Sequence, residues 1–385
     1  MLEWENLSCQ YFKMKQKIKF INKDKTQFYS VLKERVDNYF IENKLSPHAN
    51  VTMVIKTFVM LGLYFVPYVL IMTQGYSLLG MWGCSLIMGL GLAGIGMSVM
   101  HDANHDAYSA NPFLNKLLGL SLTLVGADIN NWKTQHNVLH HTYTNIHNYD
   151  RDIADKAIMR FSPHGKYKKV QKLQVLYVFL FYSIMSLYWT VAKDFVQYYE
   201  FIKEGHNKDS KVVKTMSFIR LIFWKSVYIT YAIVLPITLL HLTFSQVAIG
   251  FLSMHLVAGL ILSVIFQLAH VVENTSFPMP DENGNMDNEW AIHQLNTTAD
   301  FSKNNWLITY YVGGLNFQAI HHLFPRICHV HYPAIAPIVE KTAKEFGIPY
   351  LYTDSFWGAL KSHVKVIAKL GRNETTFAAI ANNMG

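Results

Sequence analysis

The sequence is poor in charge and in cysteine. Only 16% of its 385 residues are Asp, Glu, Lys or Arg, whereas 51% are hydrophobic. No charged residue occurs from Thr57 to Met100 or from Ser226 to Val272. This composition argues against a soluble protein of several domains and indicates a membrane protein. The three cysteines, Cys9, Cys84 and Cys328, have no CxxC spacing, so a disulfide framework is not expected.

Each uncharged stretch is long enough for a helical hairpin, because a bilayer core of ~30 Å takes ~20 helical residues. The turns are expected at residues 73–77 and 241–245, which contain no Lys or Arg. The first fifty residues carry nine, so the positive-inside rule predicts cytoplasmic termini. The expected fold is an all-α integral membrane protein with four transmembrane helices and a cytoplasmic helical domain. The predicted regions are a cytoplasmic segment (1–50), a hairpin (51–100), a cytoplasmic region (101–217), a second hairpin (218–270) and a cytoplasmic region (271–385).

A third apolar segment, residues 175–191, is also long enough to cross a membrane. We interpret it as a helix in the interface or on the cytoplasmic domain, because Tyr and Trp occur along it and Lys172 and Lys193 flank it. The charged N-terminal region does not resemble a cleaved signal peptide. The net charge of +8 lies on segments predicted to be cytoplasmic, so anionic lipid headgroups explain it and nucleic acid is not an expected partner.

Eight histidines fall into four groups, each at or beyond the end of an uncharged stretch long enough to enter a membrane. They are His101 and His105 in HDANH, His136, His140 and His141 in HNVLHH, His270 in FQLAHVVE, and His321 and His322 in QAIHH, where Gln318 precedes them. Histidines four apart share one face of a helix. We therefore predict that these eight side chains hold two metal ions with no carboxylate ligand. Gln318 is either a weak ligand or a residue that holds a bound water.

The ligand set does not name the metal, since imidazole suits Zn, Cu, Fe and Ni, but two ions in a nitrogen-rich cage favour redox chemistry. Candidates to accept a ring N–H and orient the ligands are Asp102, Asp106, Asp150 and Asp152, or these are ordinary loop and cap residues. His293 is a further candidate. We expect the isolated histidines His48, His147, His164, His206 and His363 to be solvated. Cys328, His329 and His331 resemble a fragment of a zinc site that lacks partners.

Two longer motifs add a resemblance to these boxes. The segment GGLNFQAIHHLFPRICHVHY and the segment WAIHQLNTTADF, Trp290 to Phe301, resemble the front-end subgroup of the membrane fatty acid desaturase family. The resemblance runs from about Val51 to Val339. It implies two iron ions that activate O₂ as co-substrate and remove two hydrogens from neighbouring methylenes of a fatty acyl chain. It also implies a cis double bond on the carboxyl side of an existing one.

The chain departs from this pattern in two ways. It has no HPGG haem motif of a fused cytochrome b5 domain, so we expect a separate electron donor, a ferredoxin or a cytochrome b5 with its reductase. Its third box reads QAIHH where QIEHH is common. The acyl group could be carried on CoA, on a carrier protein or on a lipid, and we expect a bacterial cytoplasmic membrane. The alternatives are a hydroxylase or sphingolipid desaturase with the same cage, or a membrane zinc hydrolase or metal-binding protein.

Overall fold

The computed structural model describes residues 17–73, 75–154, 156, 158–207 and 209–374, so Cys9 and the first lysines of the N-terminal segment lie outside it. Within these residues five helices are long and apolar enough to cross a bilayer, judged by length and composition. They span Val51–Met72, Leu78–Asn104, Lys169–Lys203, Lys211–Leu240 and Phe244–His270. The sequence predicted four crossings and identified the third of these helices as the ambiguous one.

Four of the long helices begin at capping residues, and two of these four continue through π-helical turns. Helix α3 (Val51–Met72) is followed by α4 (Leu78–Gly94), which continues through a π-helical turn (Ile95–Val99) into α5 (Met100–Asn104). Helix α12 (Lys211–Ile229) continues through a π-helical turn (Thr230–Val234) into α13 (Leu235–Leu240) and is followed by α14 (Phe244–His270). Ser77 caps α4, and Thr243 with Gln246 forms a capping box on α14. These caps satisfy backbone groups at helix ends that a membrane would leave without partners.

Helix α4 lies at the centre of the bundle because its glycines allow close packing. A Cβ atom at Gly91 would lie 2.5 Å from the backbone nitrogen of Tyr64 in α3. At Gly89 it would lie 2.7 Å from the carbonyl oxygen of Met254 in α14. Small residues let helices in a bilayer approach closely, so α3, α4 and α14 form a tight unit.

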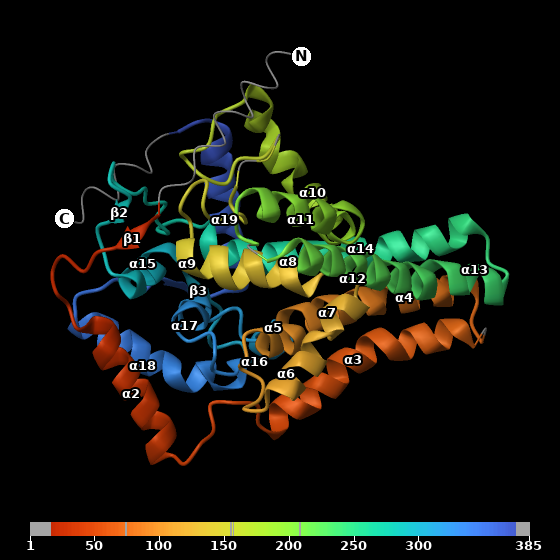
Figure 1. Cartoon of the computed structure of the whole chain (residues 1–385), viewed down its shortest axis with the longest axis horizontal. Coiled ribbons are helices and arrows are strands. Elements are labelled where there is room, and N and C mark those ends of the chain that lie inside the picture. The colour runs from red at the N-terminus through yellow and green to blue at the C-terminus, as the bar shows by residue number, and fades with distance from the viewer. Residues whose placement is uncertain (1–16, 74, 155, 157, 208, 375–385) are drawn as a thin grey trace.

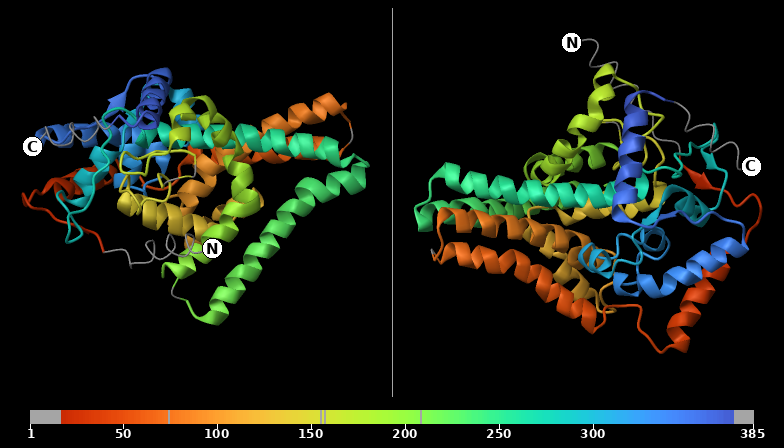
Figure 2. Two further views of the ribbon diagram at one scale, coloured as in Figure 1. Left: turned by 90° about the horizontal axis from the view of Figure 1, so that it is seen from above. Right: turned by 180° about the vertical axis from the view of Figure 1, so that it is seen from behind.

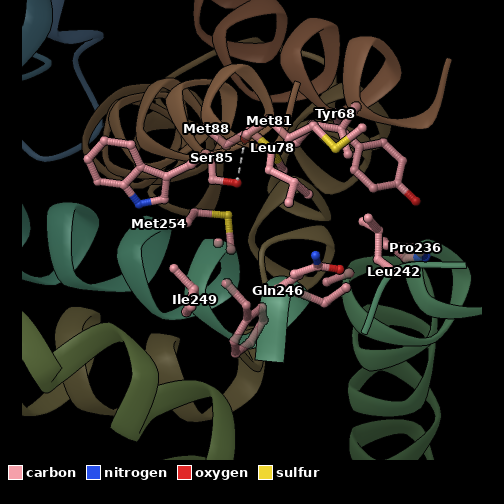
Figure 3. A pocket seen from close by; sticks show the side chains of 16 residues that line it. Tyr68, Leu78, Met81, Ser85, Met88, Pro236, Leu242, Gln246, Ile249 and Met254 are labelled. Carbon is pink, nitrogen blue, oxygen red and sulfur yellow. Dashed lines mark hydrogen bonds between the residues drawn. The ribbon is translucent and has the colours of Figure 1, made fainter. Parts of the chain in front are cut away.

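The bundle has two distinct ends (Figure 1). The connections α3–α4 and α13–α14 lie together at one, here called the connection end, and His101 and His270 lie at the other, here called the histidine end. Helix α12 diverges from the other long helices (Figure 2, left). At the connection end a cavity of about 240 Å³ lies between the two hairpins (Figure 3). Its walls are mainly apolar and include Tyr68, Ser85, Met88, Pro236, Gln246 and Met254.

The long helix Lys169–Lys203 packs on α14 near the histidine end. It consists of a 3₁₀ turn (Lys169–Leu173), α10 (Gln174–Tyr188), a π-helical turn (Trp189–Lys193) and α11 (Asp194–Lys203). The Ser186 hydroxyl in α10 lies 3.0 Å from Nδ1 of His255 in α14. The Tyr182 hydroxyl donates to Nε2 of His363 over 2.9 Å, and His363 Nδ1 donates to Val271 O over 2.7 Å. The expectation that His363 is solvated is therefore wrong, because it joins three segments in the core.

Helices shorter than the five long ones, and four strands, form the rest of the secondary structure of the described chain. The helices are α2 (Phe28–Glu42), α6 (Pro112–Gly119), α7 (Ser121–Leu124), α8 (Ile129–Lys133), α9 (His141–Tyr143), α15 (Trp290–Thr297), α16 (Trp306–Tyr311), α17 (Gln318–Leu323), α18 (Tyr332–Glu345) and α19 (Phe356–Gly371), with a 3₁₀ turn at His329–His331. Two parallel strand pairs join distant segments. Strand β1 (Lys19–Phe20) pairs with β2 (Asn285–Met286), and β3 (Asp300–Phe301) pairs with β4 (Tyr352–Thr353). Helices α2 and α18 pack around a second apolar core that also contains α17.

Candidate metal centre

Irregular helical turns bring the first two histidine motifs together. His101 follows the π-helical turn at Ile95–Val99, and His105 is the residue after α5. The second motif lies in a π-helical turn, Thr134–His140, that leads into α9. Because a π-helix bonds residue i to residue i+5, a residue lies close to the fifth as well as the fourth residue beyond it. The ring of His136 is accordingly 5.4 Å from that of His140 and 4.8 Å from that of His141, between centroids.

One group of ligating atoms combines histidines of the HDANH, HNVLHH and QAIHH motifs. His101, His105, His136 and His321 each present a nitrogen, and these four atoms lie within 4.8 Å of one another. Nε2 of His101 is 3.2 Å from Nε2 of His136. The indole of Trp132 stacks on His136 with centroids 4.6 Å apart, which covers this group with an apolar surface.

A second group is formed by His140, His270 and His322, whose ligating atoms also lie within 4.8 Å of one another. The side chain of Gln318 belongs beside this group, since its Nε2 is 3.4 Å from Nε2 of His270. The ring of Phe266 lies 4.9 Å from the rings of both His140 and His270. The lone histidine of the sequence thus lies at the end of α14 among histidines from the other motifs.

His141 lies between the two groups. Its ring centroid is 4.6 Å from that of His321 and 4.4 Å from that of His322. Its Nε2 is 3.3 Å from Nε2 of His136. The structure therefore brings all eight predicted histidines and Gln318 into one cluster with two centres.

The cluster has the unpartnered atoms that a metal site needs. Among the described residues, five of its buried ring nitrogens have no hydrogen-bond partner: Nε2 of His105, His140, His321 and His322, and Nδ1 of His141. Oε1 of Gln318 also has none. Buried polar atoms are nearly always bonded, and exceptions of this kind point to an ion. A donor set rich in imidazole nitrogen suits a transition metal, so the residues present fit two such ions.

Hydrogen bonds on the opposite side of the rings orient these ligands. Nδ1 of His140 donates to Oδ2 of Asp150 over 3.0 Å. Nδ1 of His322 donates to Oε1 of Gln294 over 2.8 Å, and Nδ1 of His321 lies 3.2 Å from the Tyr332 hydroxyl. Bonds of this type fix the tautomer, so the Nε2 lone pair faces the cluster. Sequence reasoning missed Gln294 and Tyr332, because neither lies next to a ligand in the sequence.

The other predicted orienting residues lie in different environments. Oδ2 of Asp152 is 3.8 Å from His140 Nδ1, and Asp152 also accepts a hydrogen bond from Gln135. His293 donates to the carbonyl oxygen of Thr144 over 2.9 Å, so it acts on the ligands only through a neighbour. Asp106 is exposed at a left-handed turn, with φ of 59°, just after the first motif. This position favours the alternative for Asp106, an ordinary loop residue.

Burial keeps most of the cluster neutral. It lowers the pKa of five histidines well below the ordinary value: His105, His136, His141, His321 and His322. For His140 burial acts in the same direction, but attraction to Asp150, the hydrogen bond that His140 donates to Asp150, and attraction to Asp152 outweigh burial and raise the pKa. A histidine must be neutral at its ligating nitrogen to bind metal, so the low values favour ligation.

A buried network that the sequence did not reveal links the first motif to α3. Nδ1 of His329 donates to Oδ2 of Asp102 over 2.8 Å. On the other side of this ring, Nζ of Lys56 donates to Nε2 over 2.7 Å. Burial lowers the pKa of His329 to about 4, so the ring is neutral. It lies between the ammonium of Lys56 and the carboxylate of Asp102 and is hydrogen-bonded to both. The fragment around Cys328 therefore has partners after all, and Asp102 orients His329 rather than His101, whose Nδ1 is 3.9 Å away.

Replacing Lys56 with methionine will lower the melting temperature of the purified protein. Lys56 is only 1% exposed, and its loss leaves the ring of His329 without a donor and the charge of Asp102 without compensation. Losing a hydrogen bond to a charged group costs about 2 kcal/mol. The measurement is thermal unfolding in detergent, with Lys33→Met, at an exposed ion pair on α2, as the control that changes little. Equal melting temperatures for the two variants would show that the network contributes no stability.

Asp300 positions the helix that carries the third motif. Its Oδ1 accepts a hydrogen bond from the backbone nitrogen of Ala319 over 2.9 Å, at the N-terminus of α17. Its other oxygen accepts one from the Tyr350 hydroxyl. Burial raises the pKa of Asp300 to about 6. The segment from Trp290 to Phe301 therefore contains, next to its last residue, the carboxylate that fixes the start of α17.

Comparison with known proteins agrees with this site. Residues 76–354 match the family model described as fatty acid desaturase. The acyl-lipid (8-3)-desaturase of Physcomitrium patens is 37% identical over 365 residues, which cover 94% of this chain and 75% of that protein. The sn-1 linoleoyl-lipid 6-desaturase of Arthrospira platensis is 36% identical over 353 residues, covering 91% and 94%. The enzyme of the same description from Synechocystis sp. is 34% identical over 361 residues, covering 93% and 98%.

These matches extend through all the histidine motifs and through both apolar hairpins, apart from the first helix in the case of the family model. They confirm the resemblance that the motifs predicted, and they argue against the zinc hydrolase alternative. The apolar helices and the family together identify a membrane protein. The chain is a fatty acyl desaturase that belongs to the fatty acid desaturase family.

Proposed function

We propose that this protein introduces a cis double bond into an acyl chain of a membrane lipid, on the carboxyl side of an existing double bond. Two iron ions would be held by the eight clustered histidines, with Gln318 at the second centre. The observation that carries the proposal is the convergence of two histidine groups at one end of an apolar bundle. A membrane-embedded substrate can reach a site in that position.

Bound iron would supply the O₂ activation that attack on an unactivated methylene requires. The chain's own residues hold and orient the ligands and keep water from the site. Trp132 and Phe266 cover the two groups with aromatic surface, which favours exclusion of water. Removing two hydrogens while reducing O₂ to two waters also consumes two electrons and two protons from outside. A separate ferredoxin or cytochrome b5 with its reductase would deliver the electrons.

We further propose four membrane crossings, α3, α4 with α5, α12 with α13, and α14. The rings of His140 and His270 lie 4.7 Å apart, so both must be on one side of the membrane. An additional crossing by α10 and α11 would put them on opposite sides. This supports the interpretation of residues 175–191 as a helix outside the hydrocarbon core. The lack of Lys and Arg in the connections supports a cytoplasmic histidine end, as in a bacterial cytoplasmic membrane.

The descriptions of the relatives support a substrate class. Two of them are described as acting on linoleoyl groups at the sn-1 position of a lipid, and a third as an acyl-lipid desaturase. We propose a lipid-bound acyl chain in preference to a CoA or carrier-protein thioester. The chain would come from the leaflet at the histidine end.

The cavity at the connection end is a candidate place for the distal part of the substrate (Figure 3). Ser85 lines it from α4, so Ser85→Phe will fill part of its volume. We expect turnover of linoleate to fall severalfold relative to a homologue two carbons shorter, because the longer chain needs more of the cavity. Competitive feeding of both acids measures the ratio. Leu79→Phe, at an exposed position of the same helix, is the matched control, and an unchanged ratio in Ser85→Phe would exclude the cavity from the substrate path.

Product analysis tests the proposed reaction. The protein is expressed in a host that makes no polyunsaturated fat, linoleate is supplied, and total fatty acids are examined by gas chromatography with mass spectrometry. The expected product is a trienoic acid whose new double bond lies on the carboxyl side of the existing ones. A hydroxylated product would establish the hydroxylase alternative instead. Separation of lipid classes before analysis will show which carrier first contains the new acid.

A further inference from the structure

We propose that α16, in the region expected to be wholly cytoplasmic, is embedded in the hydrocarbon of the leaflet at the histidine end and presents Trp306 and Leu307 to lipid acyl chains. The inference rests on α3 and α4 crossing the membrane, and it concerns a surface that binds lipid.

Contacts place α16 at a defined depth on the first hairpin. The Tyr311 hydroxyl donates to the carbonyl oxygen of Leu90 in α4 over 2.9 Å. Nζ of Lys56 in α3 lies 4.6 Å from the ring centroid of Tyr310. Counted from Leu78 at the connection end, a core of ~30 Å is crossed by about residue 98, so Leu90 lies ~12 Å inside its boundary. In Figure 1 α16 lies at this end of the bundle, next to α5 in the view.

The outward surface of α16 is apolar. Trp306 is 76% exposed and Leu307 is 60% exposed. Leu90 and Ile87, next to the Tyr311 contact, are also exposed on α4, so the apolar surface is continuous with that of a crossing helix. No Asp, Glu, Lys or Arg occurs between Lys303 and Arg326. An exposed apolar surface of this kind is more stable in contact with lipid hydrocarbon than in contact with water.

The segment also meets the second requirement of the bilayer core, which is a satisfied backbone. Asn305 caps α16 by accepting from the backbone nitrogen of Ile308 over 3.1 Å. Past the helix, Val312 N donates to Ile308 O over 2.9 Å and Gly314 N donates to Thr309 O over 3.0 Å. An irregular loop that points its amide groups at lipid would be excluded, but this one bonds them internally.

The location gives α16 a role at the metal centre. Gly313 has φ of +64°, and a Cβ there would lie 2.1 Å from the carbonyl oxygen of Met97, in the turn that precedes His101. A few residues later α17 begins at Gln318 and carries His321. An embedded α16 therefore fixes the third motif at the boundary of the leaflet from which the acyl chain comes.

Spin labelling in lipid nanodiscs tests the inference. With Cys9→Ser as background, and with Cys84 and Cys328 buried, a nitroxide is attached to Leu307→Cys. A label at Phe58→Cys, exposed on α3, is the reference for hydrocarbon. A label at Asn38→Cys, exposed on α2, is the reference for water. Power saturation with O₂ and with a water-soluble nickel chelate measures the depth of each label.

The label at position 307 is expected to meet O₂ and avoid nickel, as the label at 58 does. If it meets nickel as freely as the label at 38 while the label at 58 remains in lipid, the inference is overturned and the crossing of α3 stands. If the labels at 58 and 307 both meet nickel, the assignment of α3 to the membrane fails as well.

Discussion

Replacing His321 with alanine will abolish desaturation while the protein still inserts into the membrane. His321 is fully buried, and its ring lies 4.5 Å from that of His101 and 4.6 Å from that of His141. Its removal takes away one of the four nitrogens of the first group, and no other described side chain in that group can replace it. Conversion of supplied linoleate should fall below detection. The same result is expected for alanine at His101, His105, His136, His140, His141 and His322.

His206→Ala is the matched control for these variants. His206 is exposed after α11 and lies outside the described metal-binding groups, so its loss should leave conversion unchanged. Amounts of each variant in the membrane fraction must be equal for the comparison to hold. Retained turnover in two or more of the seven cluster variants would contradict a shared metal cage.

Gln318→His will have a smaller effect than any of these changes. The side-chain amide of Gln318 lies beside His270, and its Oε1 has no hydrogen-bond partner among the described residues. An imidazole can occupy the same coordination position, so reduced but measurable conversion is expected. Complete loss with unchanged iron content would indicate that the amide positions a water or the substrate instead.

Asp150→Asn will lower turnover by roughly 10- to 100-fold, the usual effect of removing a partner that orients a metal-bound histidine. Asp150 is fully buried and accepts hydrogen bonds from Nδ1 of His140 and from the backbone nitrogen of Asn145, both over 3.0 Å. Asparagine preserves the shape but replaces one acceptor oxygen with a donor and removes the charge. His140 would then lose the bond that directs its Nε2 toward the second group. Initial rates in membranes with equal enzyme content measure the effect.

Metal content separates a change in orientation from a loss of folding in Asp150→Asn. A variant that folds but orients His140 poorly will be recovered in the membrane with less iron or with slower turnover at equal iron. Asp287→Asn, on an exposed surface ion pair, is the control and should behave as the unaltered protein. Full activity in Asp150→Asn would contradict the role of the carboxylate.

Spacing in the sequence predicted the histidine cluster because histidines four apart share a helical face. The pairs His101 with His105 and His136 with His140 show this directly, and the uncharged stretches predicted which helices bring them to one end. The position of His141 depends on a π-helical turn, which no local sequence pattern predicts. His270 could be assigned only from its position at the end of an apolar run.

Contacts between distant segments were beyond sequence reasoning. Lys56 reads as the last charge before an apolar run, yet it is buried against His329, 273 residues later. Hydropathy likewise could not distinguish α10 from a crossing helix, because its composition is that of a span. The proposal that it lies outside the hydrocarbon core comes from the closeness of the rings of His140 and His270. The lipid-facing role proposed for α16 comes from its contacts with α3 and α4.

Metal analysis of the purified, active protein will show whether the histidine cluster holds two iron ions. Elemental mass spectrometry of protein expressed with ample iron and zinc should find about two iron atoms per chain and little zinc. Combined replacement of His321 and His322 by alanine should remove most of that iron, whereas His206→Ala should retain it. A single zinc per chain, or iron content that does not depend on His321 and His322, would contradict a two-iron centre in this cluster.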